Sequence, residues 1–158
     1  MGYTHYWEVN KVRGKSAEIE EIYKRAIKDC QRVAHAYNKA CAARGDTDAR
    51  LSGYTAHAKV GSYGGLNLNG KGDLAHESFT FREHFNENES FNFCKTARKP
   101  YDAVVVACLA ILKHRLGDAI TVSSDGDASD WNEGIKLARR ITGLKIKNPI
   151  PKREKVAA

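Results

Sequence analysis

Residues 3–9 are rich in aromatic side chains, and the period of two of a β-strand places Tyr3, His5, Trp7 and Val9 on one face. From Ser16 onward apolar residues recur every three or four positions, which is the helical period, until Gly45. Ser16 is a suitable N-cap, and glutamates in the first turns suit the positive end of a helix dipole. The pattern therefore predicts a strand followed by one long helix.

The second half of the chain repeats this alternation with shorter elements. A second helix is expected from Pro100 to about Leu116, and its centre, residues 103–112, is apolar on all sides. Residues 119–123 are expected to form a short strand. A third helix is expected from Asp130, where Asp130 and Glu133 have the spacing of a capping box, to residue 143.

The segment between the first two helices is rich in glycine, which favours short strands and exposed loops over residues 46–76. Residues 78–85 and 90–95 carry regularly spaced phenylalanines, and they predict a β-hairpin. The order of elements indicates an α+β fold with two layers, in which a mixed, mostly antiparallel sheet packs against three helices. We expect a single domain over residues 1–143.

Charge is distributed unevenly along the chain, although the whole carries 26 Lys and Arg against 19 Asp and Glu. Residues 136–158 hold eight basic residues and one acidic residue, so the rest of the chain is balanced. We therefore expect residues 144–158 to be a basic, flexible C-terminal tail. The alternative is a tail that binds nucleic acid by neutralising phosphates.

The sequence favours the cytoplasm. Its start has neither a basic stretch nor an apolar segment of the kind that directs secretion. No apolar run approaches the roughly 20 residues of a membrane span. The four cysteines lack the spacing of zinc or redox pairs, which is typical of reduced thiols.

The sequence predicts no cofactor. Residues 65–72 approach the phosphate-binding pattern G-x-x-x-x-G-K-[ST], but the last position lacks a hydroxyl and no helix pattern follows. The six histidines do not have the spacing of metal ligands.

A cationic segment directly before the second helix is the first candidate site. Lys95, Arg98 and Lys99 lie there together with the hydroxyl of Thr96. Cations are unfavourable at the positive end of a helix unless an anion binds, so the pattern suggests a phosphate site. The alternative is a solvated loop in which Asp102 merely improves the start of the helix.

A second candidate site lies between the last strand and the third helix. Asp125, Asp127 and Asp130 could hold Mg²⁺ or Ca²⁺, although the calcium-loop pattern is incomplete and helix capping is the favoured interpretation. Ser124 and Asp125 could instead recognise ligand hydroxyls or base edges.

The aromatic face of the first strand could complete a nucleotide site. Tyr3, His5 and Trp7 share that face, and flat side chains stack on nucleobases. The alternative, which we favour, is that they are ordinary core residues.

Three motifs resemble a family of small uncharacterised bacteriophage and prophage proteins. They are GYTHYW at residues 2–7, FCKTARKPYD at residues 93–102, and SSDG at residues 123–126 with Trp131 after it. The resemblance extends over most of the chain up to about residue 143. The family has no established activity, so the resemblance implies only a setting, which is a viral protein in the cytoplasm of a bacterial host.

These observations predict a binding protein whose pocket holds a phosphorylated, nucleotide-like small molecule without turning it over. In a phage setting the ligand would be a host defence signal. One alternative is a metal-dependent enzyme acting on a phosphorylated nucleotide, with Asp125 and Asp127 holding magnesium. The other is an accessory protein that binds nucleic acid or a protein through the basic tail.

Overall fold

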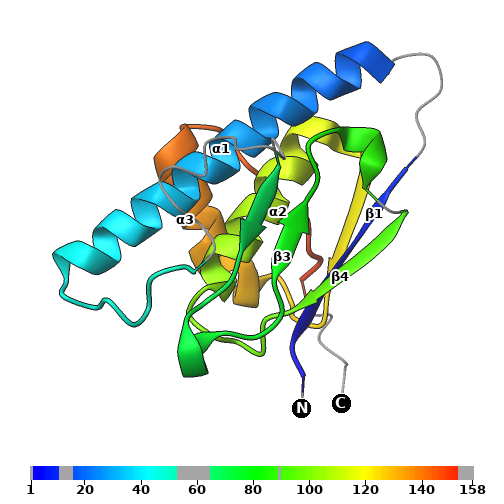
Figure 1. Cartoon of the computed structure of the whole chain (residues 1–158). Coiled ribbons are helices and arrows are strands. Elements are labelled where there is room, and N and C mark those ends of the chain that lie inside the picture. The colour runs from blue at the N-terminus through cyan, green and yellow to red at the C-terminus, as the bar shows by residue number, and fades with distance from the viewer. Residues whose placement is uncertain (1, 11–15, 53–64, 89, 153–158) are drawn as a thin grey trace, which may run out of the picture.

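The computed structural model describes residues 2–10, 16–52, 65–88 and 90–152. It has the expected α+β architecture, in which the helices lie on one side and a three-stranded sheet on the other (Figure 1). The strands and helices, in chain order, are β1 (Thr4–Val9), α1 (Ser16–Ala43), β2 (Leu66–Leu68), β3 (Phe79–Phe81), β4 (Phe91–Lys95), α2 (Asp102–Leu116), β5 (Ile120–Ser124) and α3 (Asn132–Thr142).

In place of one mixed sheet, the described strands form two antiparallel sheets, the smaller of which pairs β2 with β3. The larger sheet has β1 at its centre, with β4 and β5 antiparallel to it on either side. In the register of the strands, His5 lies opposite Cys94 on one side and Ser124 on the other. Since β1 runs against both neighbours, its beginning lies beside the carboxyl ends of β4 and β5. The loops that lead into α2 and α3 therefore leave the sheet at the same end.

The prediction that residues 78–85 and 90–95 pair as a hairpin is wrong. Strand β3 pairs with β2, and β4 pairs with β1 instead. The phenylalanines of β3 are buried beside Trp7, whose ring stacks on Phe81 at a centroid distance of 5.2 Å. Phe91 and Phe93 of β4 are 54% and 56% exposed. The two segments therefore direct their aromatic rings to different sides of the molecule, which a shared hairpin face would not allow.

Helix α2 forms the centre of the core. Its apolar stretch is buried on all sides, between α1, α3 and the sheet. Gly134 lets α3 approach closely, because a Cβ there would lie 2.5 Å from a methyl carbon of Val106. Burial of this helix supplies much of the hydrophobic stabilisation that a chain of this length can collect.

The expectation of a flexible tail is wrong for residues 144–152, which pack onto the body. Ile146 and Ile150 are buried, and the guanidinium of Arg139 donates to the carbonyl of Ile146. The Asn148 amide donates to the carbonyl of Ala128 at 2.7 Å. Ile146 and Ile150 anchor the segment in the core, whereas its basic character alone predicted that it would be exposed to solvent. Residues 153–158 lie outside the described residues.

Candidate functional site at the carboxyl ends of β4 and β5

The two segments singled out in the sequence meet in space. The loop of residues 96–101 follows β4, the loop of residues 125–131 follows β5, and the start of β1 lies between them. Backbone hydrogen bonds tie both loops to β1, from the Thr96 amide to the Tyr3 carbonyl and from the Asp125 amide to the Thr4 carbonyl. The site lies at the end of the molecule marked N in Figure 1, where α2 and α3 also begin.

A chain of hydrogen bonds centred on His5 crosses this end of the sheet. His5 Nε2 lies 2.7 Å from Asp102 Oδ1, and His5 Nδ1 lies 2.8 Å from Ser124 Oγ. The Thr96 hydroxyl donates to the same Asp102 oxygen, and the Gly126 amide donates to Ser124 Oγ at 3.0 Å. The chain thus joins the first residue of α2 to the last residue of β5 through a fully buried imidazole.

The chemistry of the partners sets the direction of these bonds. A carboxylate can only accept, so Nε2 carries the proton that faces Asp102. In the neutral imidazole Nδ1 then accepts from the Ser124 hydroxyl. Asp102, His5 and Ser124 therefore form a continuous chain of hydrogen bonds that ends at a half-buried serine.

Arg98 bridges the two loops from above. Its guanidinium lies over the Tyr3 ring, 4.0 Å from the ring centroid, and Nη1 lies 3.1 Å from Asp130 Oδ1. The Arg98 side chain is nevertheless 62% exposed, and the hydrogen bond to Asp130 raises its pKa. Ala97 and Arg98 both have left-handed backbone, with φ of 51° and 58°. Non-glycine residues rarely adopt this conformation, so the backbone of the loop is strained at the two residues that place Arg98.

Tyr3 lies beneath Arg98 and is almost completely buried. Burial and the nearby Asp102 carboxylate raise the pKa of Tyr3 to about 12. Its hydroxyl lies near the Ser124 side chain but makes no hydrogen bond of standard geometry to the described residues. It lies against Gly126, where a Cβ would come within 2.5 Å of the hydroxyl oxygen. A buried hydroxyl without a well-formed hydrogen bond is costly to the folded state, and its burial keeps it out of reach of a ligand.

Asp125 is held at the edge of the sheet by two donors. Its carboxylate accepts from the Thr4 amide and from the Tyr6 hydroxyl, each at 3.0 Å. The second of these bonds raises the pKa of Tyr6. Because Asp125 is exposed, its remaining lone pairs face solvent, where a ligand hydroxyl or amine can reach them.

The other two aspartates of this loop start a helix, as the favoured interpretation expected. Asp127 Oδ1 accepts from the Ser129 and Asp130 amides, and Asp130 Oδ2 accepts from the Asp127 amide at 2.9 Å. This is a reciprocal capping box, and it lies three residues before the predicted box of Asp130 and Glu133. Among the described residues no three His, Cys, Asp or Glu side chains are grouped to hold a metal ion. The carboxylates proposed for Mg²⁺ or Ca²⁺ serve here as hydrogen-bond acceptors.

The remaining predicted residues divide between the site and the interior. Lys95 and Lys99 are half-buried beside the loops, and neither ammonium pairs with a carboxylate of the described residues. Thr96 is fully buried, so its hydroxyl serves Asp102 and not a ligand. Trp7 lies in the core against Phe79 and Phe81.

The predicted stacking role of the aromatic face is therefore corrected. Tyr3 is covered by Arg98, Trp7 packs in the core, and the His5 ring meets Tyr3 and Trp131 edge-on. None of the three rings is exposed. The favoured alternative, that they are core residues, describes their burial correctly.

Sequence reasoning missed the role of Asp102, which it treated only as the start of a helix. Its partner His5 is separated from it by 97 positions, so no local pattern could link them. Trp131, which was noted only as part of a motif, closes the other side of the His5 ring.

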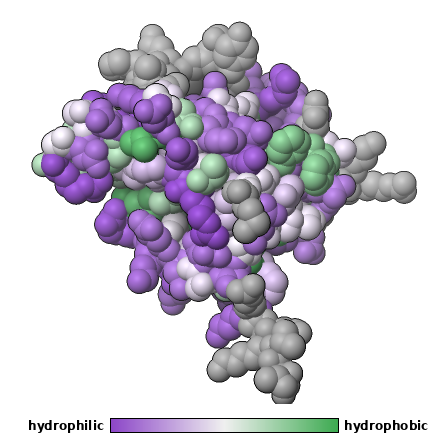
Figure 2. All heavy atoms as spheres, turned by 90° about the horizontal axis from the view of Figure 1, so that it is seen from below, coloured by the Kyte–Doolittle hydropathy of each residue, from purple (hydrophilic) through white to green (hydrophobic). Residues whose placement is uncertain are grey.

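The end of the molecule that carries the site is mostly hydrophilic on its surface, with small apolar patches (Figure 2). No described helix has the length and apolar character needed to cross a bilayer. Comparison of the chain with protein-family models, with curated proteins and with solved structures finds no match. The functional argument therefore depends on the geometry of the site.

Proposed function

We propose that the protein binds a phosphorylated, nucleotide-like small molecule at the end of the sheet where the two loops meet. The observation that carries this proposal is the position of Arg98, which reaches from one loop to Asp130 in the other, above Tyr3. The Tyr3 ring and the Asp130 carboxylate hold the exposed guanidinium in one position. It is therefore preorganised to form two parallel hydrogen bonds with a phosphate.

The phosphate group would displace Asp130 from Arg98. An exposed ion pair of this kind contributes little to stability, so the exchange costs little. Lys95 and Lys99 would add point charges, and the amino ends of α2 and α3 favour an anion at the same place. The cations that are unfavourable at a helix start would then have a partner.

The rest of the ligand would be recognised through hydrogen bonds. Ser124 and the exposed carboxylate of Asp125 would accept from ligand hydroxyls or from a base edge. This mode replaces the aromatic stacking suggested by the sequence, since the rings are buried.

The biological role that fits such a protein is sequestration. If the resemblance to phage proteins holds, the ligand is a soluble nucleotide signal of host defence, and the protein acts in the bacterial cytoplasm. Binding without turnover would be sufficient for this role.

The test is a thermal-shift and native mass-spectrometry screen against mono-, di- and cyclic nucleotides. We expect at least one compound to stabilise the protein and to remain intact. Arg98→Ala should lower its affinity about tenfold or more, as expected for loss of a charge-assisted pair. The matched control is Arg82→Ala, which removes an exposed arginine on another part of the surface. Unchanged affinity in Arg98→Ala would contradict the proposal.

A second candidate function, turnover of the same ligand, is favoured by the chain from Asp102 through His5 to Ser124. The Ser124 hydroxyl is placed to pass its proton to His5 Nδ1, which is the arrangement that activates a serine. Consumption of the nucleotide that stops in Ser124→Ala would support this function. Turnover that requires magnesium and stops in Asp125→Asn would instead support the metal-dependent alternative.

A further inference from the structure

The exposed face of α1 is strongly basic. Five exposed basic or titratable side chains follow one another at intervals of three or four residues and so form one stripe along the helix. We call this set the α1 stripe, and it consists of Arg25, Lys28, Arg32, His35 and Lys39. It is about 21 Å long, from 14 residues at about 1.5 Å each.

No exposed carboxylate interrupts the α1 stripe. Between residues 22 and 43 the only acidic residue is Asp29, and it is buried. Its carboxylate accepts from Arg115 Nε at 2.6 Å and lies 3.4 Å from Arg32 Nη1. Apart from Arg32, no member of the stripe forms an ion pair within the described part of the chain. Its charge is therefore largely uncompensated.

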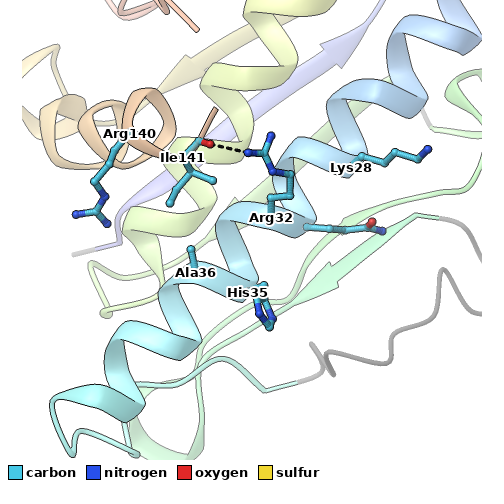
Figure 3. A pocket seen from close by; sticks show the side chains of 7 residues that line it. Lys28, Arg32, His35, Ala36, Arg140 and Ile141 are labelled. Atoms are coloured by element: carbon cyan, nitrogen blue, oxygen red, sulfur yellow. Dashed lines mark hydrogen bonds between the residues drawn. The ribbon is translucent and has the colours of Figure 1, made fainter. Parts of the chain in front are cut away.

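Helix α3 widens this basic surface. Arg140 and Ile141 of α3, with Lys28, Arg32 and His35 of α1, line a shallow hollow between the two helices (Figure 3). Arg32 links α1 to α3 beside this hollow, because its guanidinium donates to the Ile141 carbonyl at 2.8 Å. Lys136 is exposed one turn before Arg140 and extends the same side of α3.

We infer that the α1 stripe and the neighbouring cations of α3 form a docking surface for the phosphate backbone of a nucleic-acid duplex. A duplex carries one negative charge per about 1.7 Å of axis, so the length of the stripe spans about twelve phosphates. A straight, rigid helix with unpaired cations is complementary to such a regular polyanion. This surface is separate from the proposed small-molecule site and does not depend on it.

Two features favour nucleic acid over other acidic partners. Among the described residues the exposed large apolar side chains are Phe91 and Phe93, and both belong to β4. The basic surface therefore has no large exposed aromatic or apolar anchor of a protein or membrane interface, and its apolar part is the partly buried Ala36 and Ile141 in the hollow. Recognition through backbone phosphates needs only cations, and these are present.

The experiment compares two charge reversals of equal size. Lys28→Glu/Arg140→Glu changes the basic surface, and Lys145→Glu/Lys147→Glu changes exposed lysines in the C-terminal segment. Fluorescence anisotropy with random-sequence DNA and RNA duplexes is measured over a range of salt concentrations. We expect the logarithm of the binding constant to fall linearly with the logarithm of the salt concentration. The slope of this line should be about −0.9 for each phosphate contact.

The first double variant should bind at least about tenfold more weakly and with a shallower salt slope, whereas the second should change affinity by less than about threefold. Lys28→Gln/Arg140→Gln repeats the test with neutral residues, and thermal unfolding confirms that each variant is folded. Equal losses in both double variants, binding confined to anionic vesicles, or no binding to either duplex would overturn the inference. Arg98→Ala should leave duplex binding unchanged, which separates this surface from the proposed nucleotide site.

Discussion

Two charged regions of this protein handle their charges in opposite ways. At the carboxyl ends of β4 and β5, Arg98 is paired with Asp130, and Asp102 accepts from both His5 and Thr96. On the exposed face of α1, Lys28 and its neighbours face solvent without a carboxylate between them. The first arrangement fixes the positions of the side chains, which suits recognition of one small ligand. The second produces a positive electrostatic potential along the helix, which suits a polyanion of any sequence.

Burial explains why the two regions differ in energetic importance. The interactions around His5 are shielded from water, so they are strong and costly to break. The cations of the α1 stripe are hydrated, and each contributes little to folding. Substitutions of the buried residues in the first region should therefore affect stability strongly, and those in the second should affect it only slightly.

The largest effect is expected for His5→Ala. The change leaves Asp102 and Ser124 without their central partner and opens a cavity between Tyr3 and Trp131. The free energy of unfolding should fall by about 3 kcal/mol, measured by urea denaturation. A loss of less than about 1 kcal/mol would show that the network does not stabilise this end of the sheet.

The next effect is expected at the turn of 3₁₀-helix, Ser129–Trp131, that leads into α3. Asp127→Ala removes the acceptor of the capping box and should lower the free energy of unfolding by about 1 to 2 kcal/mol. Asp73→Ala, at another exposed aspartate, is the control and should change it by less than about 0.5 kcal/mol. Equal losses in the two variants would contradict the capping role.

A smaller, pH-dependent effect is expected for Tyr3. Its pKa is about 12 in the folded protein and 10.0 in the reference state, so between these values the folded state binds more protons than the unfolded state. Stability should therefore fall as the pH rises from about 10 to about 12, and Tyr3→Phe should make this decline less steep.

Chemical denaturation across that pH range provides the measurement. At neutral pH the Tyr3→Phe variant should be as stable as the parent or more stable by up to about 1 kcal/mol, since it loses a buried hydroxyl without a well-formed hydrogen bond. An unchanged alkaline decline would show that Tyr3 ionises as readily in the folded protein as in the unfolded chain.

The smallest effect is expected for Lys28→Glu. The substitution places a carboxylate three or four residues from Arg25 and Arg32, and it relieves repulsion along the α1 stripe. The protein should become more stable by a few tenths of a kcal/mol, at about 0.2 to 0.5 kcal/mol per pair, and the gain should shrink in high salt. A loss above about 1 kcal/mol would mean that Lys28 has a structural partner.

The prediction of the sheet shows how far local patterns extend. The periods of residues 3–9 and of the helices correctly identified β1, α1, α2 and α3. The pairing of β3 was wrong, because Phe79 and Phe81 have the same alternation as the strands on either side. Alternation predicts that a segment is a strand, but its partner depends on which face of the whole molecule buries it.

Charge counting failed for a related reason. The body of the chain is balanced in total, yet the glutamates of α1 lie in its first turns, while the exposed cations of residues 25–39 meet no exposed carboxylate on the same helix. A sum over the sequence does not contain this separation. The positions of Ile146 and Ile150 were likewise hidden beneath the basic character of the C-terminal segment.

The sequence by itself determined the kinds of element, their order, and the residues with chemical potential, since periodicity, caps and charge are local properties. Only the tertiary structure decided that His5 joins Asp102 to Ser124, that Arg98 meets Asp130, and that the aromatic rings are buried. These contacts connect residues that are many positions apart. They exist because antiparallel pairing of β1 with β4 and β5 brings three distant segments to one end of the sheet.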